Sequence, residues 1–493
     1  MDSDSDDEYW GTYQRLPQET TRLPFSSFSS QGVSQSLDFS WNDPCGSAKL
    51  SAGSIGSTPS IFSQETVELE PGALISVGSR CFELHDLLGV GSFGSVWCAT
   101  CHTSGATVAL KEILSLNKES MEAAKLEAQR LHALHDVIQD RSGCAALPNL
   151  LAAATATYGN GYRTVMVMEQ IPGEPLRQAL EGGQLLVPRG DPMAQAVYFA
   201  SEMLRQLAMV MHPLSKRFLH RDANSQNILV QASSGQYHFG LIDFGLAVDA
   251  MSWSCGGWRG YGASGDGRFW TTSSWMLFTS GPEALDSACE DLQSEYTLRT
   301  DLHSVGLSAL QALVVLSEDA DWLNNHGEVA MESLRNLREA WKQYWCYASS
   351  CWERVLDAFN RDARGAIKMQ LRQELVHETF AAHFTKLHEC LLQVRSSLYA
   401  SKECRGGKLG DRCLALRVVE ALLHMISTGR RWTDGCGAWE QVLELMCETS
   451  QTWTGHVLFF PQSGLACASF ILLAEVRSTA RKNVWLLWMR CYA

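Results

Sequence analysis

Three side chains in the middle of the sequence have the types and the spacing of a site that transfers a phosphoryl group. Asp222 follows His220 and Arg221, and Asn227 stands five residues after Asp222. The run Ile242-Asp243-Phe244-Gly245 then adds a second acidic residue. Phosphoryl transfer needs a carboxylate at the attacking hydroxyl and oxygen ligands that hold a divalent metal against the phosphates. Asp222 can be that carboxylate, and Asn227 and Asp243 can be the metal ligands.

Glycines and a lysine upstream could hold a nucleotide. Gly89, Gly91 and Gly94 lie in one turn between two predicted strands, and Lys111 ends the apolar run Val108-Ala109-Leu110. Backbone without Cβ atoms can approach a triphosphate closely. The GxGxxG pattern alone is equally typical of a plain hairpin or of a dinucleotide-binding turn. A predicted strand rather than a helix follows it here, which excludes the dinucleotide-binding interpretation.

Together these motifs resemble those of eukaryotic-type protein kinases, and the resemblance covers about residues 80 to 320. It implies a divergent member of the family that binds ATP and Mg²⁺ (or Mn²⁺). It also implies that Asp222 is the catalytic base, with Lys111, Glu127 and Arg221 in the same machinery, and that Asn227 and Asp243 bind the metal. The residues implied for the nucleotide are Gly89, Gly91, Gly94, Val96, Lys111, Met168, Glu169 and Ile171.

Glu127 is the acidic partner that we expect for Lys111. The segment from Asn117 to His135 predicts a helix, because apolar residues recur at helical spacing, and Glu127 falls on the same face. A carboxylate on an apolar face needs a cation. The resemblance supplies Lys111 as that cation. Glu122 is the alternative partner, but it lies off the apolar face.

The segment from Asp243 to about Glu283 resembles the activation segment of the family. Arg221 directly before Asp222 goes, in the family, with activation segments that a phosphate controls, and the hydroxyls from Thr271 to Ser274 are candidate sites. Gly281-Pro282-Glu283 resembles the Ala-Pro-Glu that closes this segment. The run from Gly265 to Trp270 is the rival alignment for the substrate-binding turn, and we favour the first alignment.

The resemblance predicts an α+β, two-lobed protein kinase-like fold. Its small antiparallel β lobe with one helix spans 80–170, and its large, mainly α-helical lobe spans 171–400. Strands are expected at 82–88, 95–101, 107–113, 152–158 and 163–168, and helices at 193–211, 302–316, several places between 331 and 399, and 417–425. Asp301 either anchors the backbone around Arg221, as the resemblance implies, or is a plain helix N-cap.

Composition limits the remaining choices. The 493 residues carry a formal charge of −14, which argues against a nucleic-acid or anionic-membrane surface. The cysteines lack repeated spacing and the acidic start lacks the regions of a signal peptide, so we expect an intracellular, cytoplasmic protein. Residues 1–79 are rich in Ser, Gly and acidic residues and are expected to be a disordered tail. Residues 401–493 are expected to be a helical extension of unreadable role, in which Pro461 interrupts the apolar stretch 457–476.

The most specific function that these residues predict is an ATP-dependent protein kinase acting on Ser or Thr hydroxyls. Its partners would be ATP and a protein substrate, with neither nucleic acid nor membrane. Asn224 departs from the family, in which serine/threonine kinases usually carry a Lys there and tyrosine kinases an Arg nearby. A catalytically weak pseudokinase scaffold and a small-molecule kinase are the alternatives. The complete set Lys111, Glu127, Asp222, Asn227 and Asp243 disfavours the scaffold, and the glycine turn with Asp243-Phe244-Gly245 disfavours the small-molecule kinase.

Overall fold

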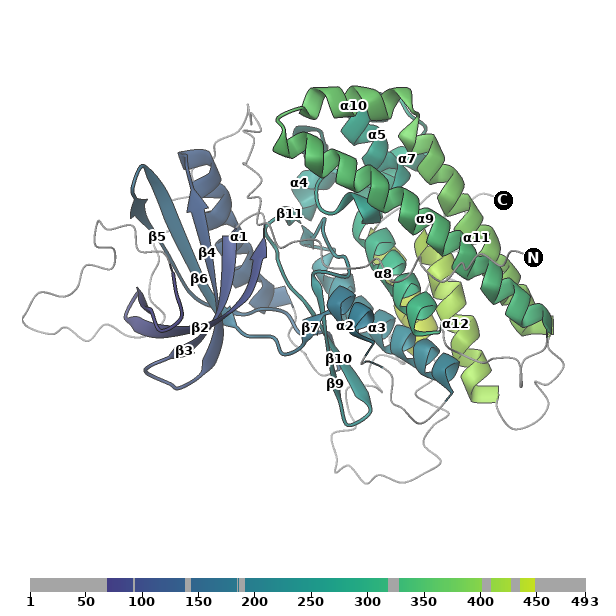
Figure 1. The fold of residues 1–493 in the computed structure, drawn as a ribbon, viewed down its shortest axis with the longest axis horizontal. Helices are drawn as coiled ribbons and strands as arrows, with labels where there is room; N and C mark the ends of the chain where they lie inside the picture. The colour runs from purple at the N-terminus through teal and green to yellow at the C-terminus, as the bar shows by residue number, and fades with distance from the viewer. Residues whose placement is uncertain are drawn as a thin grey trace, which may run out of the picture. The chain divides into compact units, whose positions relative to one another are not determined.

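The computed structural model describes residues 69–91, 94–137, 143–183, 185, 191–317, 328–400, 409–426 and 435–447. In these ranges an antiparallel sheet with one helix comes first in the chain, and mainly helical structure follows (Figure 1). The expected tail up to residue 68 and the apolar stretch 457–476 lie outside the described residues.

The sheet contains one strand more than the five that the pattern predicted. Its strand order is β1-β2-β3-β4-β6-β5, and all neighbours are antiparallel. The strands are β1 (Leu74–Val77), β2 (Arg80–Gly91), β3 (Gly94–Cys101), β4 (Thr107–Ser115), β5 (Leu150–Tyr158) and β6 (Gly161–Glu169). Because successive side chains point to opposite faces, Trp97, Leu110 and Val167 fill one apolar core, and Lys111 and Met168 face the other side.

Strand β1 lies inside the segment that we expected to be a disordered tail. It pairs with the beginning of β2, and Val77 is buried in the core of the sheet. Four residues between glycine-containing turns are too few to give a readable alternation, so only the pairing with β2 reveals the strand. The ordered chain therefore begins before residue 80.

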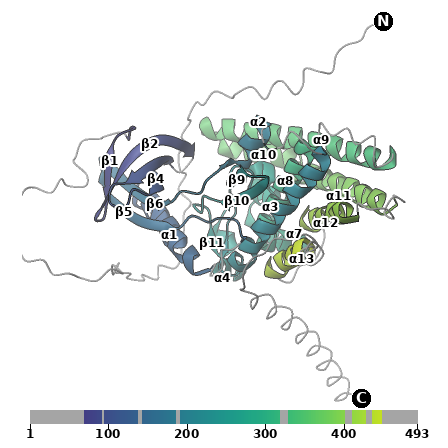
Figure 2. The ribbon, with the colours of Figure 1, turned by 90° about the horizontal axis from the view of Figure 1, so that it is seen from below.

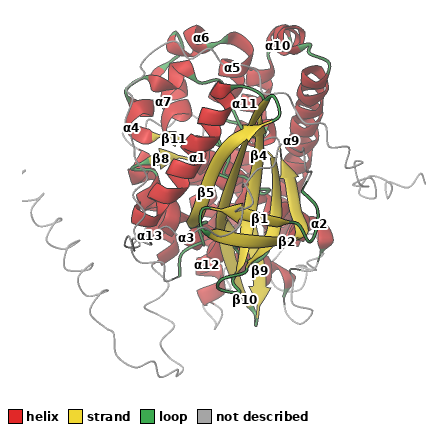
Figure 3. Ribbon diagram, turned by 90° about the vertical axis from the view of Figure 1, so that its left-hand side faces the viewer, coloured by secondary structure: helices red, strands yellow, loops and turns green. Residues whose placement is uncertain are grey.

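Helix α1 (Lys118–Val137) covers one face of the sheet and confirms the predicted helical pattern (Figure 3). Its first turn is capped because the side-chain oxygen of Asn117 accepts a hydrogen bond of 2.8 Å from the backbone N–H of Ser120. The face that packs against the sheet is buried, and Glu127 lies on it with 3% of its surface exposed. Helix formation thus carries a carboxylate into the interior.

The helical part is built around two buried helices. Asp191 accepts a hydrogen bond from the backbone N–H of Met193 and caps α3 (Pro192–Leu214), which extends three residues beyond the predicted end at 211 and includes Pro213. Helix α8 (Thr300–Leu316) is buried along almost its whole length. The other helices are α2 (Leu176–Gly182), α4 (Ala250–Ser254), α5 (Thr272–Ser280), α6 (Pro282–Asp286), α7 (Glu290–Leu298), α9 (Glu328–Asn360), α10 (Arg364–Gln373) and α11 (Val376–Ala400). Two small sheets lie between them. One has the strand order β10-β9-β7, formed by β10 (Gln236–Leu241), β9 (Ile228–Ser233) and β7 (Glu174–Pro175), and the other pairs β8 (Phe218–Leu219) with β11 (Val248–Asp249).

The helices beyond residue 401 share this core. Helices α12 (Leu409–Ile426) and α13 (Gly435–Cys447) pack on α3, and α12 also packs on α8 and α11 (Figure 2). Arg299, at the start of α8, donates hydrogen bonds of 3.0 and 3.2 Å to the carbonyls of His424 and Met425 at the end of α12. The described part of the expected extension is therefore built into the helical core. No helix in the described ranges combines the length and apolarity needed to cross a bilayer.

Candidate active site

Lys111 joins three distant parts of the chain. Its Nζ lies 2.7 Å from Oε1 of Glu127 on α1 and 2.8 Å from Oδ1 of Asp243. The expected ion pair with Glu127 is therefore present, whereas Glu122 instead accepts from Lys125. Burial by itself would lower the pKa of Lys111, but the carboxylates of Asp243 and Glu127 outweigh burial and raise it. The lysine is held as a cation.

The 220–227 loop is fixed from behind by α8. The Asp301 carboxylate accepts backbone hydrogen bonds from His220 at 2.7 Å and from Arg221 at 2.6 Å. Arg221 has a positive φ of 67°, and Asp243 has one of 63°. Such backbone is unfavourable for residues with a Cβ atom and persists where the surroundings impose it. Asp301 therefore anchors the loop, as the resemblance implied, and is not a plain N-cap.

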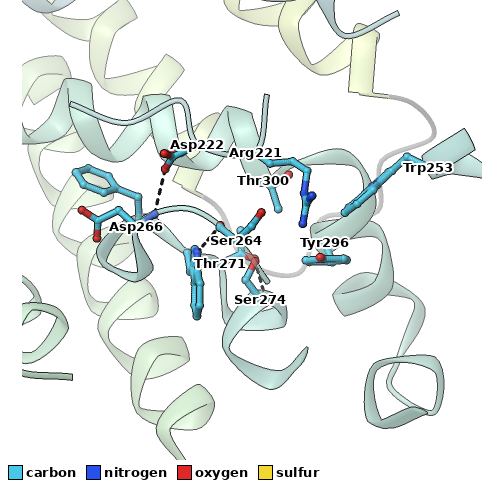
Figure 4. A pocket seen from close by; sticks show the side chains of 12 residues that line it. Arg221, Asp222, Trp253, Ser264, Asp266, Thr271, Ser274, Tyr296 and Thr300 are labelled. Atoms are coloured by element: carbon cyan, nitrogen blue, oxygen red, sulfur yellow. Dashed lines mark hydrogen bonds between the residues drawn. The ribbon is translucent and has the colours of Figure 1, made fainter. Parts of the chain in front are cut away.

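Asp222 sits among three donors. Its Oδ1 accepts from the backbone N–H of Asp266 at 3.0 Å (Figure 4) and from Nδ2 of Asn224 at 2.6 Å. Its Oδ2 accepts from Nδ2 of Asn227 at 2.8 Å. Burial raises the pKa of Asp222 to about 8, and the negative charges of Asp266 and Asp243 act in the same direction. The structure thus holds one fixed carboxylate that can take up a proton near neutral pH.

Asn227 and Asp243 fit a divalent metal. Asn227 uses its Nδ2 for Asp222, so its amide oxygen is left for a ligand. Lys111 and the backbone N–H of Gly245 both bond to Oδ1 of Asp243, and no described residue donates to Oδ2. Amide and carboxylate oxygens are the ligands that Mg²⁺ takes in proteins.

The residues expected to bind a nucleotide lie on one sheet, except Ile171, which follows its strand β6. Gly94 has φ of +144°, and a Cβ there would lie 1.8 Å from the carbonyl oxygen of Glu112, so the tight turn requires glycine. A Cβ at Gly89 or Gly91 would meet no atom within 4 Å. Val96 pairs with Lys111 across neighbouring strands.

The expected adenine contacts lie at the end of β6. Met168 pairs with Ala109, on the same face of the sheet as Lys111. The backbone N–H of Glu169 donates to the carbonyl of Asn149 at 3.0 Å, so the sheet already uses this donor. The Ile171 side chain packs against Gly240, where a Cβ would come within 2.5 Å of it.

The favoured alignment of the 243–283 segment is wrong. Gly265 and Asp266, in the rival alignment, lie directly against the 220–227 loop: a Cβ at Gly265 would be 2.5 Å from Oδ1 of Asp222. Gly281 instead ends α5, and Pro282 begins α6. The Gly-Pro-Glu resemblance is local, whereas the turn at Asp222 depends on packing across the fold. The sequence signal that could have identified Asp266 is the glycine on each side of it.

The hydroxyls from Thr271 to Ser274 are not open phosphorylation sites, which corrects a second expectation. All four residues are buried, with at most 5% of their surface exposed. Thr271 caps α5 by accepting from the backbone N–H of Ser274, and Glu295 accepts from the backbone N–H of Ser273. The run is polar because it begins a buried helix, where hydroxyls satisfy backbone donors.

The family comparison covers the sheet and most of the helical part. A family model described as protein kinase domain matches residues 82–394. The chain is 28% identical over 238 residues to the serine/threonine-protein kinase sid1 of Schizosaccharomyces pombe, which covers 48% of this chain and 41% of that protein. It is 28% identical over 168 residues to the dual specificity protein kinase shkC of Dictyostelium discoideum, covering 33% of this chain and 28% of that protein.

The chain therefore matches less than half the length of each of these curated relatives. A solved kinase-domain structure shares 16% identity with the chain at a TM-score of 0.35, covering 50% of this chain and 67% of that one.

Proposed function

The chain belongs to the protein kinase domain family, and we propose that it transfers the γ-phosphate of ATP to Ser or Thr hydroxyls of protein substrates. One observation carries the proposal. Lys111 Nζ bonds to both Glu127 and Asp243, although these carboxylates lie 16 and 132 residues away in the chain. Such a lysine can position phosphates beside a metal-binding carboxylate. We also propose that the sheet and the helices form two lobes that enclose the nucleotide between them.

Each group has a part in the proposed reaction. Lys111 holds the phosphates, and Glu127 keeps its ammonium in place. Asp222 accepts the proton of the substrate hydroxyl while Asn224 and Asn227 orient its carboxylate. Asn227 and Asp243 would hold Mg²⁺ or Mn²⁺, whose positive charge lowers the energy of the charge that develops on the phosphate.

The remaining groups bind and position. Gly89, Gly91 and Gly94 leave room for the triphosphate, and Val96 and Met168 offer apolar surface to adenine. Main-chain groups at Glu169 and Ile171 are the proposed adenine contacts, with the carbonyl of Glu169 preferred because its N–H is already bonded. We expect the protein to work in the cytoplasm, with ATP and a protein substrate as its partners.

Asp222→Asn tests the proposal. The amide keeps the size of the carboxylate and one acceptor oxygen but cannot take up the proton, so phosphate transfer should fall by at least about 100-fold. Transfer from labelled ATP to a peptide library measures the reaction, and titration with a fluorescent ATP analogue measures nucleotide affinity, which should change less than about threefold.

The matched control is Asp357→Asn, the same chemical change on the exposed surface of α9. It should leave both readouts unchanged. Turnover of Asp222→Asn within severalfold of wild type would remove Asp222 from the mechanism. If the wild-type chain binds the nucleotide but transfers no phosphate to peptides or to small hydroxyl compounds, the pseudokinase scaffold is favoured instead.

A further inference from the structure

Arg221, next to Asp222, has its guanidinium group against two aromatic rings of the 243–283 segment. Its Cζ lies 4.8 Å from the centre of the Trp253 ring and 5.2 Å from that of the Tyr261 ring. Its Nη2 also donates a 2.6 Å hydrogen bond to the carbonyl of Gly262. Figure 4 shows the guanidinium beside Trp253 and Tyr296 in a small pocket that Asp222 also lines. We call Trp253 and Tyr261 the aromatic clamp.

The clamp is itself rigid on one side. Trp253 is 1% exposed, and its Nε1 donates to the carbonyl of Thr297 at 3.1 Å. Its ring centre lies 5.3 Å from that of Tyr296. The short helix α4 that carries Trp253 is capped by Asp249, which accepts from the backbone N–H of Ser252 at 2.7 Å. A ring held in this way can fix the cation that lies against it.

The clamp can also hold the loop that carries Asp222. A guanidinium is attracted to the face of an aromatic ring, and more strongly where water is excluded. Arg221 has an unfavourable positive φ, so the loop needs contacts that keep it there. Asp301 holds the backbone of Arg221 by a hydrogen bond, and the clamp holds its guanidinium group.

We propose that Trp253 and Tyr261 are positioning residues for Asp222, which they hold through Arg221 without any phosphate on the 243–283 segment. This inference rests on the proposed function. It differs from the phosphate-controlled segment that the sequence suggested, because the residues from Thr271 to Ser274 are buried and the hydroxyls of Thr271, Ser273 and Ser274 are hydrogen-bonded to one another. The cation instead meets aromatic surface that is present in the unmodified chain.

Tyr261 gives the sharpest test because 44% of its surface is exposed, so substitutions there can be tolerated. Tyr261→Phe keeps the ring and removes the hydroxyl that a phosphate would need, and Tyr261→Leu removes the ring. The full chain is treated with a phosphatase, and loss of phosphate is checked by mass spectrometry. We expect wild type and Tyr261→Phe to keep kcat within about twofold after treatment, and Tyr261→Leu to lose roughly 3- to 10-fold in kcat with an unchanged KM for ATP.

Trp253 gives the second test. Trp253→Phe keeps an aromatic face, whereas Trp253→Leu keeps only apolar volume, and both lose the bond to Thr297. We expect kcat to fall roughly 5- to 30-fold in Trp253→Leu and clearly less in Trp253→Phe. Combining Trp253→Leu with Arg221→Met should add little further loss, because both changes remove the same contact.

Trp258→Leu is the matched control. Trp258 is buried in the same apolar cluster, but its ring lies over Arg259, 4.5 Å from Cζ, and not over Arg221. It should lower the melting temperature as Trp253→Leu does while kcat stays within about twofold of wild type. Equal losses of kcat in Trp258→Leu, Trp253→Leu and Trp253→Phe would reduce the clamp to ordinary packing and overturn the proposal.

Activity before and after phosphatase treatment distinguishes the proposed kinase function from the role of the aromatic clamp. Activity before phosphatase treatment reports the proposed kinase function, and its survival after treatment reports the clamp. If treatment abolishes wild-type activity, a phosphate is needed. If Tyr261→Phe is as impaired as Tyr261→Leu, the hydroxyl and not the ring is needed. Either result makes the clamp proposal wrong while the kinase function stands. If no activity is found before treatment, both are wrong.

Discussion

At the scale of single residues, the buried charges around Lys111 dominate the site. Lys111 and Glu127 are 6% and 3% exposed, and Asp243 also bonds to the ammonium. Taking a charge out of water is costly unless an opposite charge compensates it. The three groups therefore stabilise one another, and the loss of one leaves the others in an unfavourable environment.

Lys111→Ala leaves Glu127 and Asp243 without their cation and should lower the free energy of unfolding by on the order of 3 kcal/mol. Glu127→Ala leaves Lys111 paired with Asp243 alone and should lower it by less. The double variant should lose clearly less free energy of unfolding than the two single variants together, because neither Lys111 nor Glu127 then remains without the other. Urea unfolding measures stability, and transfer from labelled ATP measures activity, which should be low in all three variants. Glu122→Ala, on the exposed side of α1, is the control and should change neither. Additive losses would show that the two residues act independently.

The raised pKa of Asp222 leads to a second prediction at the scale of single residues. Its pKa is raised to about 8, mainly by burial and further by the charge of Asp266. A base must be deprotonated to act, so kcat/KM should rise with pH through this value. Asp266→Asn keeps the backbone N–H that bonds to Asp222 but removes the negative charge, so the rise should move to lower pH. Profiles of kcat/KM between about pH 5.5 and 9 measure it, with Asp357→Asn as the control. If the profile of Asp266→Asn is unchanged or moves to higher pH, the charge of Asp266 does not help to raise the pKa of Asp222.

At the scale of elements, α8 connects the site to the helical core. Its first turn carries Asp301, which holds the 220–227 loop, and its middle packs closely on α12. A Cβ at Gly306 would come within 2.7 Å of the Cβ of Met425, so the close approach of the two helices requires this glycine. A change in the packing of α8 should therefore reach the loop through Asp301.

His303 on α8 makes the fold sensitive to acid. Burial, with the nearby charge of Arg299, lowers the pKa of His303 from 6.5 to about 3. Between these pH values the unfolded chain binds a proton that the folded chain does not, so acid favours unfolding. The free energy of unfolding should fall by about 1.4 kcal/mol per pH unit from this residue alone as the pH drops below 6.5.

His303→Leu removes this contribution and should flatten the pH dependence by that amount. Urea unfolding at several pH values between about 4 and 7 measures it. His238→Gln, on the exposed surface of β10, should keep the wild-type slope. Equal slopes for wild type and His303→Leu would show that the folded protein accommodates a protonated His303.

At the scale of the whole molecule, one apolar core joins the segments before and after residue 400. It includes side chains of α3, α8, α11, α12 and α13, among them Val418, Leu422, Met425, Trp439 and Val442. Burying one such side chain stabilises a protein by roughly 1.5 to 3 kcal/mol. Several together reach the entire stability of a typical domain, about 5 to 15 kcal/mol. The C-terminal helices are therefore expected to be necessary for folding.

Truncation tests this expectation. A chain that ends at residue 400 should fail to give a cooperative thermal transition, whereas a chain that ends at residue 447 keeps α12 and α13 and should melt near the full-length temperature. At the other end, a start at residue 69 should be tolerated, and a start at residue 80 should lower the melting temperature because it removes β1 with the buried Val77. Circular dichroism during heating measures all four chains. A cooperative transition in the chain ending at 400 would contradict the shared core.

The sequence by itself determined the local structure and the chemical groups of the site. Periodic apolar residues predicted α1 with Glu127 on its inner face, and short apolar or β-branched runs between turns predicted the strands that carry Lys111 and Val96. These patterns are readable because neighbours three to four apart on a helix, or two apart on a strand, face the same side. The spacing from Asp222 to Asn227 lies within one loop and is equally local.

Only the tertiary structure decided which part of the 243–283 segment lies against Asp222. The sequence offered Gly265-Asp266 and Gly281-Pro282-Glu283 on similar local grounds, and packing against the 220–227 loop selected the first. The burial of Thr271 to Ser274 and the meeting of Arg221 with Trp253 have the same origin. Contacts between residues tens of positions apart depend on how whole elements pack, and no local periodicity records that packing.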